Sequence, residues 1–289
     1  MARRSPDINR VALNLLVAYP YVKAGVLRII EDRRKDIRWL VDSGAFTAWK
    51  AGKVIALDDY CRFIESLPVE PWRYFALDVV GDPAGTLRNY ETMLRRGFKP
   101  VPVFTRGEDM SVLDEFYRTS DLVAVGGLVG TLGNKGFVNG LMERVGKRKV
   151  HWLGFVQANY VKHYRPYSCD SSSWDGSGRF ARMLLYRGQG STSWLTKNDF
   201  ARMPDKRTLA TVRSYGFNPR DFAIAGNWDG GRSHNRRLSA QSAVRMSLDM
   251  QRQIGTLMFL ALTTDTALDI VLQGFDREVE RTGVQHAQA

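Results

Sequence analysis

The chain contains few of the residues from which disulfide frameworks and zinc clusters are built. Cys61 and Cys169 are its only cysteines among 289 residues, too few for a multi-disulfide scaffold or a cysteine-rich zinc site. Its four histidines show no HExxH pattern and no close metal-ligand spacing. We therefore expect a protein of a reducing, cytoplasmic compartment that needs no metal and no cofactor.

Long hydrophobic runs and nucleotide-binding loops are also missing. No stretch of about 18 apolar residues occurs, so no membrane span is expected. The charged beginning, MARRSPDINR, is not followed by the apolar stretch of a secretory signal. There is no GxGxxG after the first predicted strand and no Walker A loop, which disfavours a nucleotide-binding open sheet.

Basic residues, by contrast, are in excess. The chain has 42 Lys and Arg against 30 Asp and Glu, a net charge of +12, and this excess favours a polyanionic partner such as nucleic acid. A solvated basic surface without a partner is the alternative. The basic clusters are Arg33-Arg34-Lys35, Arg95-Arg96, Lys147-Arg148-Lys149 and Arg236-Arg237.

Short apolar runs alternate with segments of helical spacing along most of the chain. The segment from Tyr60 to Leu67, for example, places apolar side chains at i, i+3, i+4 and i+7, one face of a helix. Asp82, Pro83 and Gly97 are a suitable cap, first residue and stop for the next helix. The predicted strands are 11–18, 39–42, 74–80, 100–105, 122–126, 150–155, 167–170 and, with a weaker pattern, 180–186.

The alternation predicts an α/β fold in a single domain. The pattern alone leaves a closed barrel and a doubly wound open sheet as the two options. Beyond about residue 200 it changes to turn-rich segments and a long predicted helix over 238–262. We expect the sheet within about 11–200, followed by a loop and helical extension over about 201–289.

Three aspartates close predicted strands. Asp42 ends the run RWLVD, Asp78 ends YFALD and Asp170 ends YSCD. One such residue alone is most often a cap, but carboxylates at the ends of parallel strands converge on one edge of the sheet. Convergent carboxylates suit acid, base or nucleophilic work at a carbon that bears a leaving group.

Other residues near these ends have two interpretations each. The pair Gly126-Gly127 allows either a tight turn or a close approach of the backbone to a flat ligand. Phe46 suits base stacking or a place in the core. We read His151 as a satisfied core histidine and Cys169 as a small buried hydrophobe.

Several of these motifs, in this order, resemble the tRNA-guanine transglycosylases. The resemblance covers about residues 11–200. Its motifs are the run from Asp42 to Phe46, Asp78, the run Gly126-Gly127-Leu128, the run from His151 to Phe155, and Asp170. It implies an irregular (β/α)8 barrel that exchanges guanine in a polynucleotide for a 7-deazaguanine base, such as preQ0, without ATP.

The resemblance also implies a role for each residue. Asp170 would attack the sugar carbon and form a covalent ester, and Asp42 would handle the proton of the leaving and entering bases. Asp78 would bind the guanine edge, the backbone near Gly127 would contact the ring substituents, and Phe46 and Leu153 would sandwich the ring. The implied substrate-binding residues are Asp78, Phe46, Ser43, Gly126, Gly127, Leu128, Leu153 and Gly154.

Two departures shape the expected substrate. The tRNA enzymes carry a zinc site of three cysteines and a histidine, which two cysteines cannot supply, and Ala45 and Thr47 replace the usual Gly and Gln. A compact, basic, zinc-free chain is more similar to the DNA-modifying branch found in phages and bacteria. We therefore expect DNA and a free 7-deazaguanine base as partners, with tRNA as the alternative.

Other possibilities stay open at this point. The chain would alternatively be a non-catalytic nucleic-acid-binding subunit, or an unrelated barrel glycosidase that acts on a small sugar. A homodimer or partner proteins are compatible with the sequence. Segments 179–187 and 232–237 are rich in arginine and are predicted to contact phosphates.

Overall fold

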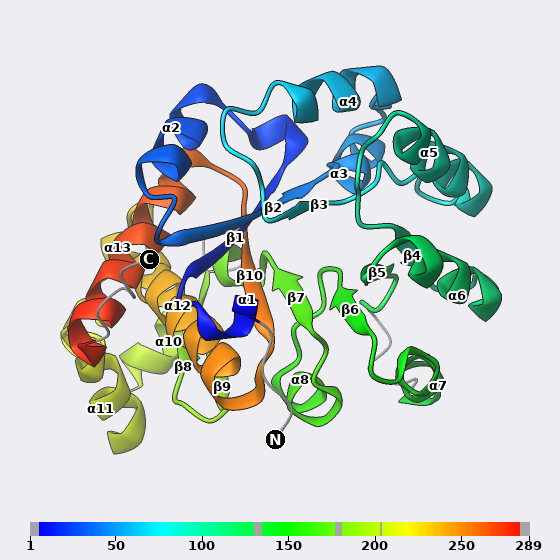
Figure 1. Ribbon diagram of the computed structural model, residues 1–289. Coiled ribbons are helices and arrows are strands. Elements are labelled where there is room, and N and C mark those ends of the chain that lie inside the picture. Colours follow the sequence, from blue (N-terminus) through cyan, green and yellow to red (C-terminus); the bar gives the residue numbers. More distant parts are fainter. Residues whose placement is uncertain (1–5, 130–134, 177–180, 203, 284–289) are drawn as a thin grey trace.

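Eight parallel strands form one curled sheet. The computed structural model describes residues 6–129, 135–176, 181–202 and 204–283. The strand order across the sheet is β3-β2-β1-β10-β7-β6-β5-β4 (Figure 1). The strands are β1 (Leu13–Ala18), β2 (Ile37–Asp42), β3 (Arg73–Tyr74), β4 (Val103–Thr105), β5 (Leu122–Gly126), β6 (Lys149–Trp152), β7 (Ser168–Ser171) and β10 (Leu257–Leu262).

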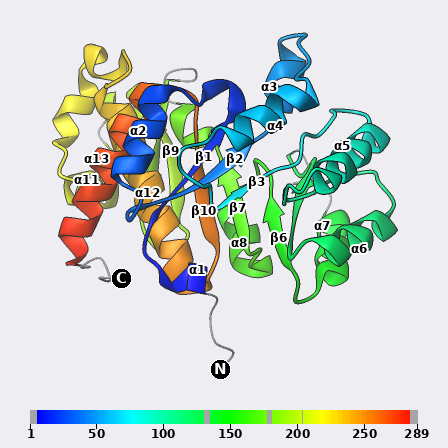
Figure 2. The same cartoon turned by 45° about the horizontal axis from the view of Figure 1, so that its top comes forward.

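Helices connect the strands and lie around the outside of the curled sheet (Figures 1 and 2). The first half contains α1 (Pro6–Asn9), α2 (Ala24–Asp32), α3 (Ala45–Lys50), α4 (Leu57–Glu65), α5 (Pro83–Arg95) and α6 (Met110–Thr119). The second half contains α7 (Lys135–Val145), α8 (Ala158–Tyr164), α10 (Lys197–Ala201), α11 (Lys206–Ser214), α12 (His234–Ile254) and α13 (Asp265–Thr282). The short 3₁₀ helices are η1 (Tyr19–Tyr21), η3 (Ser173–Gly176), η4 (Pro219–Ala223) and η5 (Ala225–Trp228).

The winding of the sheet distinguishes between the two predicted architectures. Apart from the edge strands β3 and β4, strands of this sheet that are consecutive along the chain are also neighbours in the sheet. The first strand, β1, pairs in parallel with the last, β10. This order is that of a barrel, whereas a doubly wound sheet reverses its direction of winding at the first strands. The doubly wound option is therefore wrong for this chain.

The strand ladder nevertheless does not close into a complete barrel. Its edge strands are β3 and β4, and only one isolated parallel bridge, between Phe75 and Val101, connects the chain after β3 to the chain before β4. Two hydrogen bonds mark it, from Ala76 N to Val101 O at 2.9 Å and from Val101 N to Tyr74 O at 2.8 Å. The sheet is thus a curled, TIM-like half-barrel, and we call the single bridge between its two edges the seam.

The eighth strand of the sheet lies in an unexpected part of the sequence. The predicted strand 180–186 does exist from Arg182 as β8 (Arg182–Tyr186), but it pairs antiparallel with β9 (Thr192–Thr196) in a separate hairpin. Phe180 lies outside the described residues. The eighth parallel strand is β10, within the segment predicted as helix 238–262, which is in fact α12 followed by a strand. The sheet therefore extends well past residue 200.

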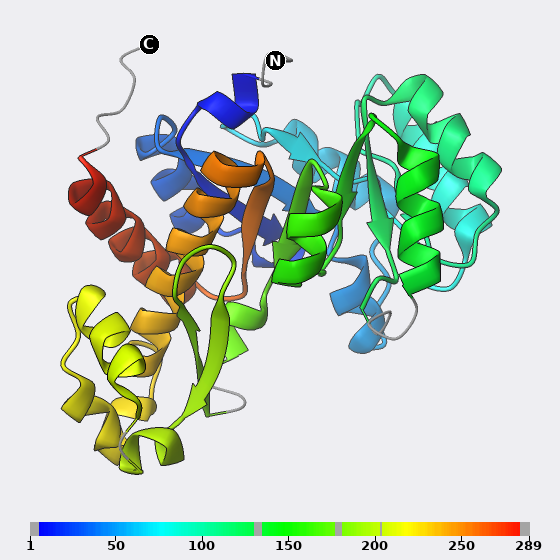
Figure 3. The ribbon, with the colours of Figure 1, turned by 90° about the horizontal axis from the view of Figure 1, so that it is seen from below.

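The hairpin β8–β9 and the short helices after it form a lobe beside α12 (Figure 3). The lobe has its own apolar cluster, which includes Met183, Phe200, Val212 and Phe222. Leu184 N donates to Ser239 Oγ of α12 at 2.9 Å, which attaches the hairpin to the helix that packs on the sheet. The lobe thus flanks the outer side of β7 and β10.

Side chains on the sheet alternate between an inner and an outer core. The inner cluster gathers residues from opposite strands, including Leu40, Ala124 and Phe259, so it occupies the concave face. Asp42 follows Leu40 by two residues, and Asp170 is the register partner of Phe259. The strand period therefore points both carboxylates at the concave face.

The turn after β2 depends on one glycine. Gly44 has φ of +77°, and a Cβ at this position would lie 2.4 Å from Pro20 Cδ. Both the backbone conformation and the contact with Pro20 exclude larger residues. The turn that carries the chain from Asp42 into α3 is thereby fixed.

We expect Gly44→Ala to lower the free energy of unfolding by about 1–3 kcal/mol more than Gly52→Ala. Gly52 also has a positive φ, of +65°, but a Cβ there would meet nothing within 4 Å. The pair separates the clash with Pro20 from the shared cost of a positive φ. Urea unfolding of both variants measures the difference, and equal losses would contradict the close packing on Pro20.

Candidate active site

Three carboxylates meet at the carboxyl end of the sheet. Asp42 ends β2, Asp170 lies near the end of β7, and Asp78 follows the short β3. Asp42 lies close enough to both of the others for their negative charges to raise its pKa. Residues far apart in the sequence are thus brought to one site, as their places at strand ends predict.

Asp170 is almost fully buried and is held through one oxygen. Its Oδ1 lies 3.1 Å from His151 Nε2 and accepts a hydrogen bond from Gly154 N at 2.9 Å. No described residue bonds to its Oδ2 in the same way. The carboxylate is therefore fixed in orientation and keeps one oxygen available, which is the arrangement that a nucleophile needs.

His151 is the residue of this site whose role the sequence interpretation missed. It is fully buried, as expected of a core histidine, but its Nε2 is bonded to Asp170 and its Nδ1 lies 2.8 Å from Ser168 Oγ. Phe75 and Phe259 pack against its ring. The motif from His151 to Phe155 gave a signal, but only the register of β6 on β7 places the imidazole beside Asp170.

Ser43 and Asp78 form a second hydrogen-bonded pair. Ser43 Oγ donates to Asp78 Oδ1 at 2.7 Å and accepts from Ala45 N at 3.2 Å. Burial raises the pKa of Asp78, while the bond from Ser43 lowers it. Ser43 therefore orients this carboxylate and occupies one of its oxygens, so a ligand with N–H donors would meet the other.

Asp42 has the properties of a group that exchanges protons near neutral pH. Loss of solvation, with the charges of Asp78 and then Asp170, raises the pKa of Asp42 to about 7. A hydrogen bond from Gly44 N to its Oδ2, 3.1 Å long, opposes the shift. A carboxyl with this pKa serves as acid and as base within one reaction cycle.

The predicted glycine and leucine residues line the next part of the strand ends. A Cβ on Gly126 would lie 3.8 Å from Leu153 Cδ1, so these two residues adjoin. Gly127 has φ of +75° and packs on Arg106, where a Cβ would come within 2.8 Å. Leu128 is fully buried in the outer core, so its side chain is not presented at the strand ends. Gly154 donates to Asp170, a role that was not predicted.

Phe46 lies on the surface, contrary to the alternative that placed it in the core. Its side chain is 55% exposed on α3, and Trp49 beside it is 56% exposed, with ring centroids 5.9 Å apart. Lys50 Nζ lies 4.4 Å from the Phe46 ring centroid. The stacking of a ring between Phe46 and Leu153 stays a prediction.

Each basic cluster identified in the sequence has at least one member in an ion pair within the protein. Arg33 pairs with Asp276 at 2.6 Å, and Arg148 with Asp114 at 2.8 Å. Arg96, Lys149 and Arg236 pair with Asp58, Asp121 and Asp175 in the same way. These side chains stabilise contacts between elements and are less available to a polyanion.

The two arginine-rich segments predicted to contact phosphates differ. In segment 232–237, Arg232 pairs with Asp269 and Arg236 with Asp175, so this part is largely structural. In segment 179–187, the first two residues lie outside the described part. Arg187 bonds to Thr208 Oγ1 at 2.8 Å, and no ion pair of Arg187 is found within the described residues.

Metal-binding and membrane-spanning features are absent from the described part of the chain. Across residues 6–129, 135–176, 181–202 and 204–283, no group of three or more His, Cys, Asp or Glu side chains is arranged to hold a metal ion. Over the same residues no helix combines the length and the apolar character needed to cross a bilayer. The side chains described at the candidate site are three carboxylates, one imidazole and the Ser43 hydroxyl.

The raised pKa of Asp42 predicts a pH-dependent stability. Because this carboxyl binds its proton more tightly in the folded protein, the folded state loses stability as the pH rises from about 4 to about 7. We expect Asp42→Asn to be more stabilising at pH 8 than at pH 5, by ~1–3 kcal/mol. Urea unfolding at both pH values measures this difference, and a difference of zero would contradict the assigned pKa.

Comparisons with known proteins assign no family to the chain. A comparison with protein-family models gives no match for the chain, and no curated protein matches it. The geometry of Asp42, Asp78, His151 and Asp170 is therefore the basis on which a reaction is inferred.

Proposed function

We propose that the chain is a DNA guanine transglycosylase that replaces guanine with a 7-deazaguanine base. The observation that carries the proposal is that two different carboxylates lie close together. Asp170 is buried and held by hydrogen bonds to one of its oxygens, and the pKa of Asp42 is raised to about 7. One carboxylate is suited to attack and the other to proton transfer. This division of labour is what a base exchange through a covalent intermediate requires.

The exchange has two balanced steps. In the first, Asp170 Oδ2 attacks C1′ of the target nucleotide, the bond from C1′ to the guanine N9 breaks, and the base leaves with a proton from Asp42. In the second, Asp42 takes a proton from the entering base, whose N9 attacks C1′ and releases Asp170. One glycosidic bond replaces another, so the cycle needs no ATP or redox partner.

The remaining residues have roles in binding and orientation. Asp78, oriented by Ser43, would accept hydrogen bonds from the N–H groups on the guanine edge. The backbone at Gly126, Gly127 and Leu128 would face the ring substituents beside Leu153. Phe46, exposed on α3, would stack on one face of the base.

DNA is the proposed polymer. Lys50 lies over the exposed ring of Phe46, next to the exposed Trp49, and within the described residues neither Lys50 nor the nearby Lys53 has an ion pair. Exposed aromatic rings next to free cations suit a nucleotide that is unstacked from its duplex. The choice of DNA over tRNA rests on the resemblance to zinc-free DNA-modifying relatives.

The scaffold is compatible with this reaction. The irregular (β/α)8 barrel that the resemblance implies has its active site at the carboxyl ends of the strands, where these carboxylates lie. The bridge between Phe75 and Val101 would serve as the seam of such a barrel. We propose that the whole described chain acts as one transglycosylase unit.

We expect Asp170→Asn to abolish base exchange, because an amide cannot form the sugar ester. The measurement is transfer of radiolabelled guanine into duplex and single-stranded DNA, with tRNA as a parallel substrate. Asp269→Asn, a surface aspartate paired with Arg232, is the matched control and should leave transfer unchanged. Label in tRNA alone would move the assignment to a tRNA enzyme, and exchange by Asp170→Asn would refute the mechanism.

His151 is expected to act as a positioning residue for Asp170. Its hydrogen bond to a carboxylate is worth roughly 1.5–3 kcal/mol, so His151→Leu should lower kcat about 10–100-fold with little change in KM for DNA. His151→Gln keeps a donor and should recover part of the rate. Equal rates for the two variants, or an effect on KM alone, would contradict the positioning role.

A further inference from the structure

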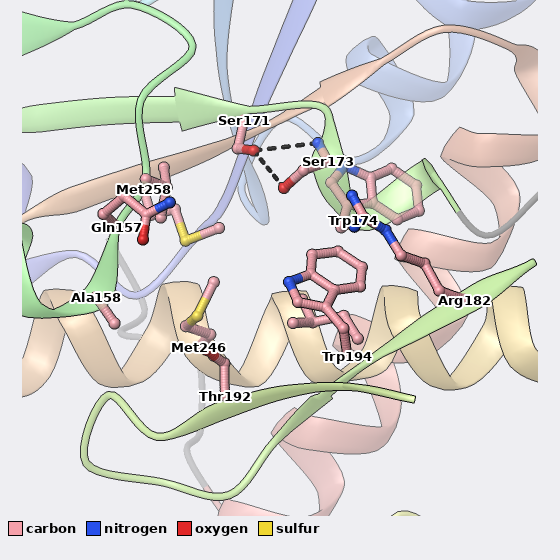
Figure 4. Close-up of a pocket in the computed structure, with 12 residues that line it drawn as sticks. Gln157, Ala158, Ser171, Ser173, Trp174, Arg182, Thr192, Trp194, Met246 and Met258 are labelled. Atoms are coloured by element: carbon pink, nitrogen blue, oxygen red, sulfur yellow. Dashed lines mark hydrogen bonds between the residues drawn. The ribbon is translucent and has the colours of Figure 1, made fainter. Parts of the chain in front are cut away.

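A cavity lies beside the candidate active site, on the other face of the sheet. It has a volume of about 300 Å³ and lies between the outer face of β7 and β10, the hairpin β8–β9 and α12 (Figure 4). Ser171, which lines it, follows Asp170 directly and is the register partner of Leu260 in the outer core. Adjacent residues of β7 thus face two different sites.

The cavity extends to the same end of the sheet as the carboxylates. Two of its lining residues, Gln157 and Ser173, come from the segments that follow β6 and β7. The carboxyl ends of these strands also carry Gly154 and Asp170. The concave site and this outer cavity therefore both adjoin the carboxyl end of β7.

One side of the cavity is apolar and adapted to a flat ring. Met246 and Met258 lie at one end and Trp174 at the other, with Trp194 between them (Figure 4). Thioether and indole groups make favourable contacts with aromatic rings. The Trp174 indole is fixed by a hydrogen bond from its Nε1 to Ala261 O at 3.2 Å, so this wall is rigid.

The polar groups of the cavity favour a ligand that accepts hydrogen bonds. No Asp or Glu is among the lining residues, whereas Gln157, Ser173 and Arg182 supply donors. The Trp194 indole nitrogen points into the space between Ser173 and Met246 (Figure 4). The Arg182 guanidinium lies 4.4 Å from the Trp194 ring centroid, so a cation and an exposed ring are presented together.

From this combination we infer that the cavity binds a nucleotide, with its base against the methionine and tryptophan wall and its phosphate near Arg182. A cation combined with a stacking surface is the usual basis of single-strand binding. The inference rests on the proposed function for its choice of nucleic acid. The source is either a nucleotide that flanks the target in the DNA strand or a free mononucleotide.

Photocrosslinking tests the site directly. Single-stranded oligonucleotides would carry 5-iododeoxyuridine at successive positions on either side of one guanine, and peptide mass spectrometry would locate the adducts. We expect an adduct on Trp194 from one or two neighbouring positions only. Adducts spread evenly over all positions, or none on Trp194, would overturn the inference.

A matched pair of variants tests the same site by affinity. We expect Arg182→Gln to weaken binding of the oligonucleotide at least about tenfold, measured by fluorescence anisotropy. Arg202→Gln removes the same charge from the same lobe but does not line the cavity, and it should weaken binding far less. Equal losses would show that only general electrostatics acts and would contradict the inference.

Equilibrium dialysis with radiolabelled dGMP separates the two sources. Binding that is lost in Trp194→Ala identifies a free-nucleotide site, whereas Trp194 adducts without dGMP binding identify a site for the DNA strand. Neither readout requires base exchange. An active enzyme without a Trp194 adduct or dGMP binding refutes only the cavity, and an inactive one with such an adduct refutes only the proposed function.

Discussion

A carboxylate that faces the concave side of a sheet is costly unless hydrogen bonds compensate for lost water, and Asp170 depends on two of them. His151 Nε2 and Gly154 N both approach its Oδ1. The imidazole is in turn fixed by Ser168 and by the rings of Phe75 and Phe259. The register of β6, β7 and β10 therefore determines how Asp170 is presented, and the chemistry of the site follows from the pairing of strands.

The local partners of the three carboxylates explain why their properties differ. Asp170 is satisfied by donors from its own neighbourhood, and Asp78 shares one oxygen with Ser43. Asp42 accepts the bond from Gly44 N, but burial and two negative neighbours raise its pKa to about 7. Carboxyl groups whose surroundings give them different pKa values are suited to different roles in one reaction.

The sequence predicted most of the sheet because its parallel strands are short apolar runs. It misplaced the eighth strand because β10, with the sequence LMFLAL, consists of residues that also favour helices and follows α12 almost directly. Gly255, with φ of +74°, ends the helix and was the available signal. The closure of the sheet depends on the contact between Phe75 and Val101, which no local pattern encodes.

For the site, the strand-end aspartates were predictable because alternation and parallel pairing bring such ends together. The contact of His151 with Asp170 was not, since it depends on the register between two strands. The pairing of the basic clusters with distant acids was hidden for the same reason: Arg33 meets Asp276 across most of the chain. Net charge therefore does not locate a surface that a polyanion would bind.

The central claim, that Asp170 forms a covalent bond to the sugar, is tested most directly by intact-protein mass spectrometry. The protein would be mixed with a guanine-containing oligonucleotide, denatured in acid and analysed, followed by peptide mapping. The account predicts a mass increase equal to the oligonucleotide less one guanine, located on Asp170. No adduct during active exchange, or an adduct on another residue, would contradict it.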